Sequence, residues 1–268
     1  MRSILYGIAL LMFLMTSAAE AKSAKYISSH YKYIGVFEKS KKTEHLKTTM
    51  NLDVMRKFIR TQWRKGYDIS EIKYGNGNWI AVFEKASPKS HQTYLVAGRW
   101  EAVNARLDAY WKQGYYMTNI EHGLAEWVVV FEKNTPYTSQ AYERRKTLDD
   151  FSDAVHTRWK MGYDLIDVEY GEGHYTGIFV KGTSYKGQAL TIRSRWIDMA
   201  KVIGSYWKKG YRITNLEFTL GRWMGVFSKY PDAKAQGFET VKTVEKFKEI
   251  FAKRQKEGYV LTDMAEGW

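Results

Sequence analysis

Five lysines recur at one position of a repeated motif, each two residues after a phenylalanine, and they are the side chains best placed to bind a ligand. Ammonium groups that symmetry brings together concentrate positive potential and attract polyanions. A lysine at a strand end also keeps a sheet edge soluble, and this alternative stays open. The five residues are Lys39, Lys85, Lys133, Lys181 and Lys229.

Four glutamines recur at a second position, downstream of the lysines. A planar amide suits the hydroxyl groups of a sugar, although it can equally tie down its own loop. We include them with the lysines as candidate ligand-binding residues. They are Gln92, Gln140, Gln188 and Gln236.

A third recurring position carries an oxygen-bearing side chain in every repeat: Glu71, Asn119, Asp167, Asn215 and Asp263. Facing a central channel, these groups would suit a cation such as calcium; alternatively, they hydrogen-bond a neighbouring bulge. Calcium sites depend on several carboxylates, and only three of the five residues are acidic. We therefore predict neither a metal site nor a cofactor.

The residues that catalysis needs do not form a recognisable pattern. The six histidines fall in different registers, and the sequence carries no Ser-His-Asp signature, P-loop or HExxH motif. The absence of cysteine excludes thiol catalysis, disulfide scaffolds and zinc ribbons. We expect a non-catalytic protein. A hydrolase or transferase with its site on loops such as Ala86–His91 or His122–Glu126 remains the alternative.

The elements that must position these residues repeat every 48 residues. Four ungapped segments begin at Trp63, Trp111, Trp159 and Trp207, and a fifth begins at Gln255. Near the other end, residues 33–39 repeat only the second half of the motif. A regular period of this length is typical of an array of identical supersecondary units.

In each unit the spacing of apolar residues predicts a helix that ends at a glycine. In the first unit Leu52, Met55, Ile59 and Trp63 fall on one helix face, and Gly66 follows where a left-handed residue is needed.

Strands come next in each unit. In the first unit they are residues 67–74, whose apolar positions switch parity as at a bulge, and residues 79–85, apolar on both faces as in a central strand. A short third strand is expected at residues 92–96.

The fold class is therefore α/β, with five β-β-(β)-α repeats of about 48 residues. The last repeat lacks a second strand and the first segment lacks a first strand, so their pairing would close a pentein-like ring. An open α/β solenoid is the alternative. The expected units lie near residues 40–85, 86–133, 134–181 and 182–229, with a split unit formed by 230–268 plus 26–39.

The motif Trp-x-x-Gly-Tyr-x-Ile-Thr at residues 207–214, followed by Val-Phe-x-Lys and a downstream Gln, resembles a known but uncharacterised Trp-Gly-Tyr repeat domain. That domain follows the kinase in plant casein-kinase-I-like proteins and occurs alone in bacterial secreted proteins. The resemblance covers most of residues 33–268 and implies no catalytic residue. Gln255 departs from it in place of Trp, and no kinase motif is present.

The first 21 residues read as a secretory signal peptide, with a positive start, an apolar run over residues 4–15 and a cleavage site at Ala19-x-Ala21. Residues 22–268 then form a single repeat domain, secreted or periplasmic, without a transmembrane segment.

Forty-two basic against 29 acidic residues give a net charge of +13. We expect a basic face that binds an anionic polymer or a protein partner, with no intracellular nucleic-acid role. A protein-interaction scaffold is the other alternative.

Overall fold

The structure is a computed structural model that describes residues 30–87 and 91–268. The expected signal peptide lies outside these residues. The described residues form five helices of 13 residues and five three-stranded antiparallel sheets, which confirms the α/β repeat architecture. The helices are α2 (Leu52–Arg64), α3 (Trp100–Lys112), α4 (Leu148–Lys160), α5 (Trp196–Lys208) and α6 (Val244–Lys256).

Each sheet has an outer, a middle and an inner strand. In that order, the sheets are β2 (Glu44–Thr49), β4 (Asn78–Lys85), β3 (Tyr67–Gly75); β5 (His91–Ala97), β7 (Glu126–Lys133), β6 (Tyr115–Gly123); β8 (Ser139–Arg145), β10 (His174–Lys181), β9 (Asp164–Gly171); β11 (Gly187–Arg193), β13 (Arg222–Lys229), β12 (Arg212–Thr219); and β14 (Gln236–Val241), β1 (Lys32–Lys39), β15 (Tyr259–Gly267).

The local features expected from the repeat are present. The strands that are apolar on both faces are the middle strands, and the inner strand β3 has a register shift between Ile69 and Glu71, which is the expected bulge. Gly66 follows α2 with a φ of 74°, and the equivalent glycines of the other units also have positive φ. The short third strand is β5.

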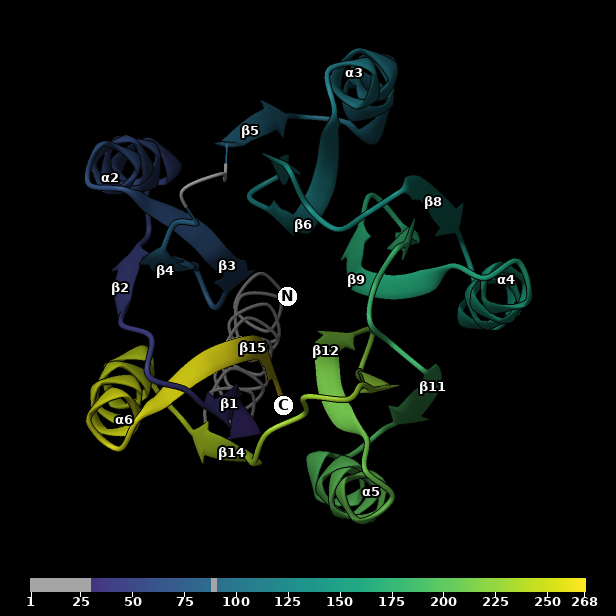
Figure 1. Ribbon diagram of the computed structural model, residues 1–268. Helices are drawn as coiled ribbons and strands as arrows, with labels where there is room; N and C mark the ends of the chain where they lie inside the picture. Colours follow the sequence, from purple (N-terminus) through teal and green to yellow (C-terminus); the bar gives the residue numbers. More distant parts are fainter. Residues whose placement is uncertain (1–29, 88–90) are drawn as a thin grey trace, which may run out of the picture.

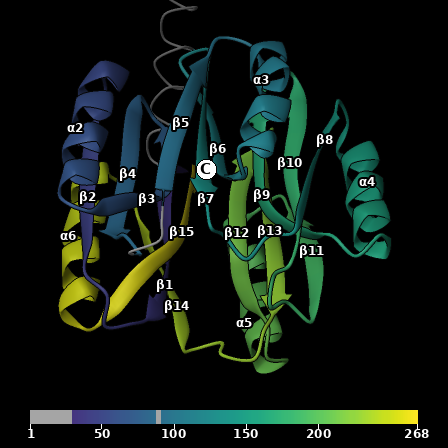
Figure 2. The same ribbon diagram turned by 45° about the horizontal axis from the view of Figure 1, so that its top comes forward.

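The two ends of the repeat array share one sheet. β1 pairs antiparallel with β14 on one side and with β15 on the other, as the complementary half-motifs predict. Figure 1 shows the five sheets arranged around a common centre, with inner strands toward the middle and helices outside. The tilted view of Figure 2 shows the helices at the periphery, outside the strands.

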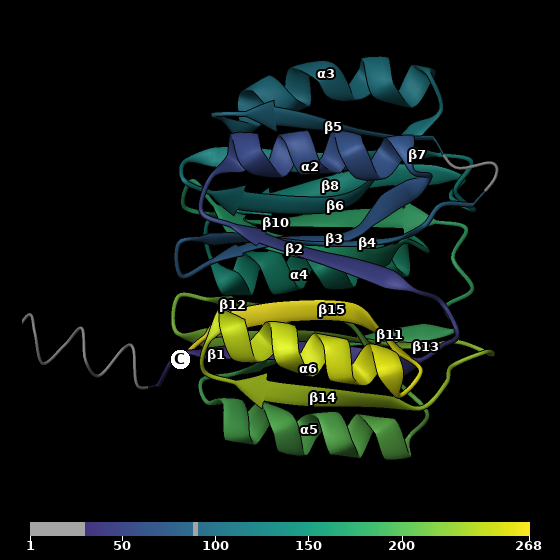
Figure 3. The same cartoon turned by 90° about the vertical axis from the view of Figure 1, so that its left-hand side faces the viewer.

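Each described helix buries one face, and a side chain caps the first turn of three of them, α2, α4 and α6. Asn51 accepts hydrogen bonds from the backbone N–H groups of Asp53 and Val54, while Leu52, Met55 and Ile59 are buried. The five helices lie roughly parallel in the side view of Figure 3.

The core consists of one apolar cluster per helix, and each cluster includes residues of a neighbouring sheet. For example, Val128 and Val130 of β7 pack with Met55 of α2 and Phe83 of β4. The inner strands also touch in sequence, β3 with β6, β6 with β9, β9 with β12, β12 with β15, and β15 with β3. Every unit is therefore stabilised by its neighbours.

None of the helices in residues 30–87 and 91–268 is long and apolar enough to cross a membrane.

Candidate functional site

The five repeated lysines lie beside the ends of the helices. The Lys39 ammonium donates to the carbonyl oxygen of Glu257 at 2.7 Å, and that of Lys85 donates to the carbonyl of Lys65 at 3.3 Å. Four of the five also lie over a tyrosine at or directly before the start of the inner strand, with the Lys133 Nζ 4.4 Å from the centre of the Tyr115 ring. These contacts stabilise the helix ends, because carbonyl groups there attract cations. Ligand binding by the lysines stays a prediction.

The four repeated glutamines join each unit to the next. Gln92 Oε1 accepts from the indole N–H of Trp63 at 3.1 Å and from the backbone N–H of Ile69 at 2.7 Å, while its Nε2 donates to the Ile69 carbonyl. The corresponding bonds of the other units involve Gln140, Gln188 and Gln236. The amides thus have the loop-tying role that was their alternative interpretation, and sugar binding by them stays a prediction.

A chemically different pair takes this place between the last unit and the first. Gln255 stands where the other units have Trp, and Glu44 stands where they have Gln. Glu44 Oε2 accepts from Gln255 Nε2 and from the Leu261 backbone N–H, both at 2.8 Å. Burial raises the pKa of Glu44 to about 8, so this carboxyl is mostly protonated at neutral pH.

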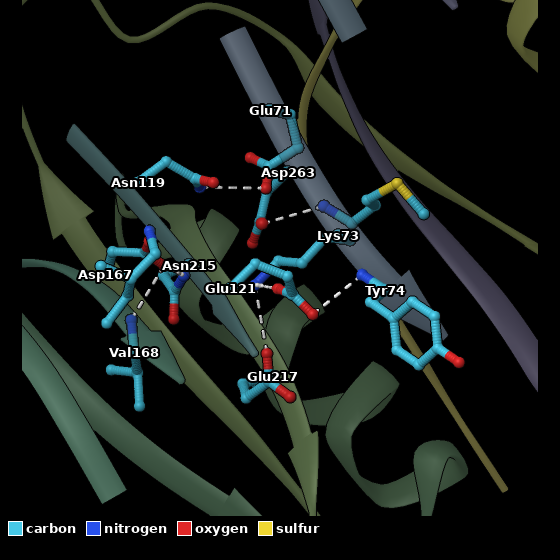
Figure 4. Close-up of polar contacts among 12 residues, drawn as sticks. Glu71, Lys73, Tyr74, Asn119, Glu121, Asp167, Val168, Asn215, Glu217 and Asp263 are labelled. Carbon is cyan, nitrogen blue, oxygen red and sulfur yellow. Dashed lines mark hydrogen bonds and ion pairs between the residues drawn. The ribbon is translucent and has the colours of Figure 1, made fainter. Parts of the chain in front are cut away.

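The recurring oxygen-bearing residues meet at the centre, where they are all buried (Figure 4). Asn119 Nδ2 donates to Glu71 Oε1 at 3.2 Å, and Asn215 Nδ2 donates to Asp167 Oδ1 at 2.8 Å. Asp167 also accepts from two backbone N–H groups next to the bulges. This is the bulge-bonding role anticipated as the alternative to a metal site. In the part of the chain that the structure describes, no group of His, Asp and Glu side chains is arranged to hold a metal ion.

A buried lysine lies beside this layer. Lys73 Nζ is 3.2 Å from Glu217 Oε2 and 3.5 Å from Glu121 Oε2, and all three side chains point toward one another in Figure 4. Burial alone would lower the pKa of Lys73, but Glu217 and Glu121 raise it above its ordinary value. Lys73 is therefore a permanent cation in an acidic interior.

Burial raises the pKa of the surrounding carboxyls: that of Asp263 to about 8, that of Asp167 to about 6, and that of Glu121 well above its ordinary value. Protonation of part of the set reduces the repulsion that full ionisation would create.

A pocket of about 610 Å³ opens beside one of the strand-end lysines, Lys39. It reaches from the rim residues Lys39 and Lys42 down to Asn119 of the central layer, and Glu44 lines it. The pocket is lined by residues from the first, second, third and last units. The loop His122–Glu126, proposed above as a possible catalytic loop, does not line it, and residues 88–90 of the loop Ala86–His91 lie outside the described residues.

Two residues of this region, Lys73 and Glu44, were not predicted as functional, and they stand out only when equivalent positions of the units are compared. Lys73 shares its register with Glu121, Glu169 and Glu217, and a cation among three acids at a 48-residue spacing is a signal that the sequence carries. Glu44 likewise shares the register of the four glutamines.

Comparison with known proteins finds a similarity to one family over part of the chain and indicates no activity. Residues 41–170 match the model of a domain of unknown function, DUF7477. A search of curated proteins finds no match. The chain is thus similar to this family over its first units, from the start of β2 to the inner strand β9.

Proposed function

We propose that this protein is a non-catalytic binding protein that holds an anionic polymer against one end of the molecule, which we call the lysine end. One observation carries the proposal. Every helix ends in an exposed cation beside a strand-end lysine, so all five units contribute positive charge to the same end. The exposed helix-terminal cations are Arg64, Lys112, Lys160, Lys208 and Lys256.

The distribution of acidic groups strengthens this proposal. Six carboxyl side chains are buried within the described residues, against a single buried lysine. Because these acids are removed from the surface, the exterior is more basic than the net charge of +13 suggests. We propose further that the polymer is met outside the cytoplasm, since the first 21 residues predict export.

The proposal includes one closed ring of the pentein type, because a circle of units brings the cations together around a single mouth. Three observations support closure over an open solenoid: β1 pairs with both β14 and β15, β15 contacts β3, and Glu44 bonds to Gln255 across the same junction. In an open solenoid the last unit would not contact the first.

The test is binding of the purified protein to heparin, lipopolysaccharide, teichoic acid and DNA at several salt concentrations. The variant Lys112→Gln/Lys160→Gln/Lys256→Gln removes three exposed cations at the lysine end. Its matched control, Arg99→Gln/Lys146→Gln/Lys242→Gln, removes three exposed cations that precede the same helices. Both variants lose the same charge and leave the tyrosine-stacked lysines intact.

We expect saturable binding to one class of polymer that weakens with salt. The lysine-end variant should lower the dependence of log K on log salt by about one for each lysine in contact, and the control should retain it. Equal losses in the two variants would show non-specific attraction to a basic chain and would contradict the proposal, as would the absence of binding.

A further inference from the structure

The end of the molecule opposite the lysine end carries most of the exposed large apolar side chains. The backbone N–H of Trp100, the first residue of α3, donates to Glu172 in the turn between β9 and β10, so helix starts and hairpin turns share this end. We call it the hairpin end. Seven such side chains are exposed among the described residues, and only Met161, which follows α4, lies at the lysine end. The six at the hairpin end are Met50, Val54, Leu124, Ile197, Leu220 and Trp268.

Three of these six lie together on two neighbouring units. Leu220 occupies the turn between β12 and β13, and Trp268 follows β15, the strand that contacts β12 (Figure 1). The Trp268 ring lies 5.2 Å from the ring of Phe218 in β12. Ile197 is in the first turn of α5, which packs against β12 and β13. Single exposed apolar residues are ordinary, whereas a group of them indicates an interaction surface.

Three exposed cations flank these apolar side chains. Arg222 opens β13 directly after the turn, Arg193 ends β11, which pairs with β13, and Lys242 follows β14 in the sheet of β15. None of the three forms an ion pair with a described residue. The acid of the α5 first turn, Asp198, is already paired with Arg195 at 2.6 Å. The positive charge of this region is therefore available to a partner.

The apolar side chains and the cations form one surface, which we call the turn patch. Exposed leucine, isoleucine and tryptophan beside arginine and lysine suit the interface of an anionic lipid bilayer. Tryptophan favours the headgroup level, and the long stems of arginine and lysine extend over apolar surface while their charges meet lipid phosphates. The turn patch consists of Arg193, Ile197, Leu220, Arg222, Lys242 and Trp268.

The chain enters the described structure beside this patch. Lys32 pairs in register with Gly267, the residue before Trp268. The sequence that precedes residue 30 is thus joined to the molecule at the hairpin end. A signal peptide holds a chain at the membrane until it is cleaved, so the expected signal peptide would present this end to the bilayer. After the expected cleavage, Lys22 and Lys25 remain and add positive charge to the same end.

We propose that the turn patch docks this protein on an anionic lipid bilayer. Its three apolar side chains enter the interface, and its three cations contact lipid phosphates. The lysine end then faces away from the membrane, toward the polymer of the proposed function. The inference does not rest on that function, because the two ends share no residue.

The experiment is sedimentation of the chain from residue 22 onward with vesicles of phosphatidylcholine, with and without phosphatidylglycerol. Leu220→Asn removes an apolar side chain from the patch, and asparagine tolerates the φ of 47° at this position. Leu124→Asn is the matched control. Leu124 holds the same position of another hairpin, outside the patch, with a φ of 51° and an exposed fraction of 58% against 64% for Leu220.

A second pair of variants tests the charge. Arg193→Gln/Arg222→Gln/Lys242→Gln removes the three cations of the patch. The lysine-end variant Lys112→Gln/Lys160→Gln/Lys256→Gln loses the same charge at the other end. Thermal unfolding checks that all four variants fold.

A fluorophore reports which end faces the lipid. The chain has no cysteine, so one introduced cysteine carries one environment-sensitive label. Ser194→Cys places it beside Arg193 of the turn patch, and Lys208→Cys places it at the lysine end; both positions are exposed.

Binding should require phosphatidylglycerol, weaken several-fold in Leu220→Asn and weaken roughly 100-fold in the patch cation variant, with both controls nearly unchanged. The label at position 194 should shift to shorter wavelength, and the label at position 208 should not. The inference is wrong if no vesicle binds the protein, if phosphatidylcholine alone binds it equally well, or if each control loses as much as its patch variant. It is also wrong if only position 208 responds, a result that would locate anion binding at the lysine end and leave the proposed function standing.

Discussion

Replacing Glu44 by glutamine should make the protein more stable, and increasingly so as the pH rises from about 5 to about 8. The change restores the residue that the other units carry at this position. A glutamine there has Oε1 to accept from the Leu261 backbone N–H and Nε2 to donate to the Leu261 carbonyl, as Gln92 does with Ile69. The carboxyl of Glu44 needs a proton to reproduce this pattern.

The magnitude follows from the shift of the Glu44 pKa. Burial raises this pKa from 4.5 to about 8 in the folded protein. Between these two values the folded state holds a proton that the unfolded chain has released, so the free energy of unfolding falls as the pH rises, and the fall ends above the folded pKa. At ~1.4 kcal/mol per pKa unit, the difference between variant and unmodified protein should grow by about 3 kcal/mol between about pH 5 and about pH 8.

Urea unfolding of both proteins at the two pH values measures this difference. Other buried carboxyls contribute to the pH dependence of both proteins and cancel in the comparison. In the reverse change, Gln92→Glu, a carboxyl replaces an amide. This variant should become less stable than the unmodified protein as the pH rises from about 5 to about 8. If the difference between Glu44→Gln and the unmodified protein is the same at both pH values, the carboxyl is not held protonated by burial and the reasoning is refuted.

Two further changes test the interior. Lys73→Met removes the cation between Glu121 and Glu217, so the pKa values of these carboxyls should rise further. The variant should then lose stability as the pH increases. Urea unfolding should show a loss of about 3–5 kcal/mol at about pH 8 and a smaller loss at about pH 5. An equal loss at both pH values would contradict this. Gly123→Ala would place a Cβ 2.2 Å from the ring of Tyr74 and should cost about 1–3 kcal/mol, whereas Gly98→Ala, whose Cβ would meet nothing closer than 4.0 Å, should change stability by less than about 1 kcal/mol. Thermal unfolding measures both glycine variants. Similar losses of stability in the two would contradict the close contact between Gly123 and the Tyr74 ring.

The elements of the fold were predictable because the repeat shows each of them four or five times. A glycine after a helix is weak evidence alone, but Gly66 and its four equivalents share one register and all have positive φ. The change of parity between Ile69 and Ile72 likewise predicts a bulge, which the register shift at Glu71 confirms. Neighbouring residues within one unit determine both features, the glycine after the helix and the bulge of the inner strand.

Contacts between registers were harder to predict. The Trp63 indole bonds to Gln92, 29 residues further along the chain and in the next unit, so neither residue reveals the other when its register is considered alone. The same applies to Lys133 and Tyr115, which lie on adjacent strands. Only the pairing of the strands brings the two registers together.

The polar interior could not be predicted from one strand. Lys73 and Glu121 alternate with apolar residues on the inner strands, a pattern typical of a sheet with one solvated face. The inner strands instead contact one another around the centre, so these side chains are 2% and 3% exposed. Their burial is a property of the whole array and not of any unit.

Three departures from the repeat lie at one junction, and this bears on where function lies. Glu44 and Gln255 replace the Gln–Trp pair between the last unit and the first, and Lys73 interrupts an acidic register on the adjoining strand β3. Four equivalent junctions satisfy the fold with the standard pair, so stability alone does not call for a different set at the fifth. One of the three departing residues, Glu44, lines the 610 Å³ pocket. The repeated residues therefore account for the architecture, and the junction where the repeat is broken is the place to look for a ligand.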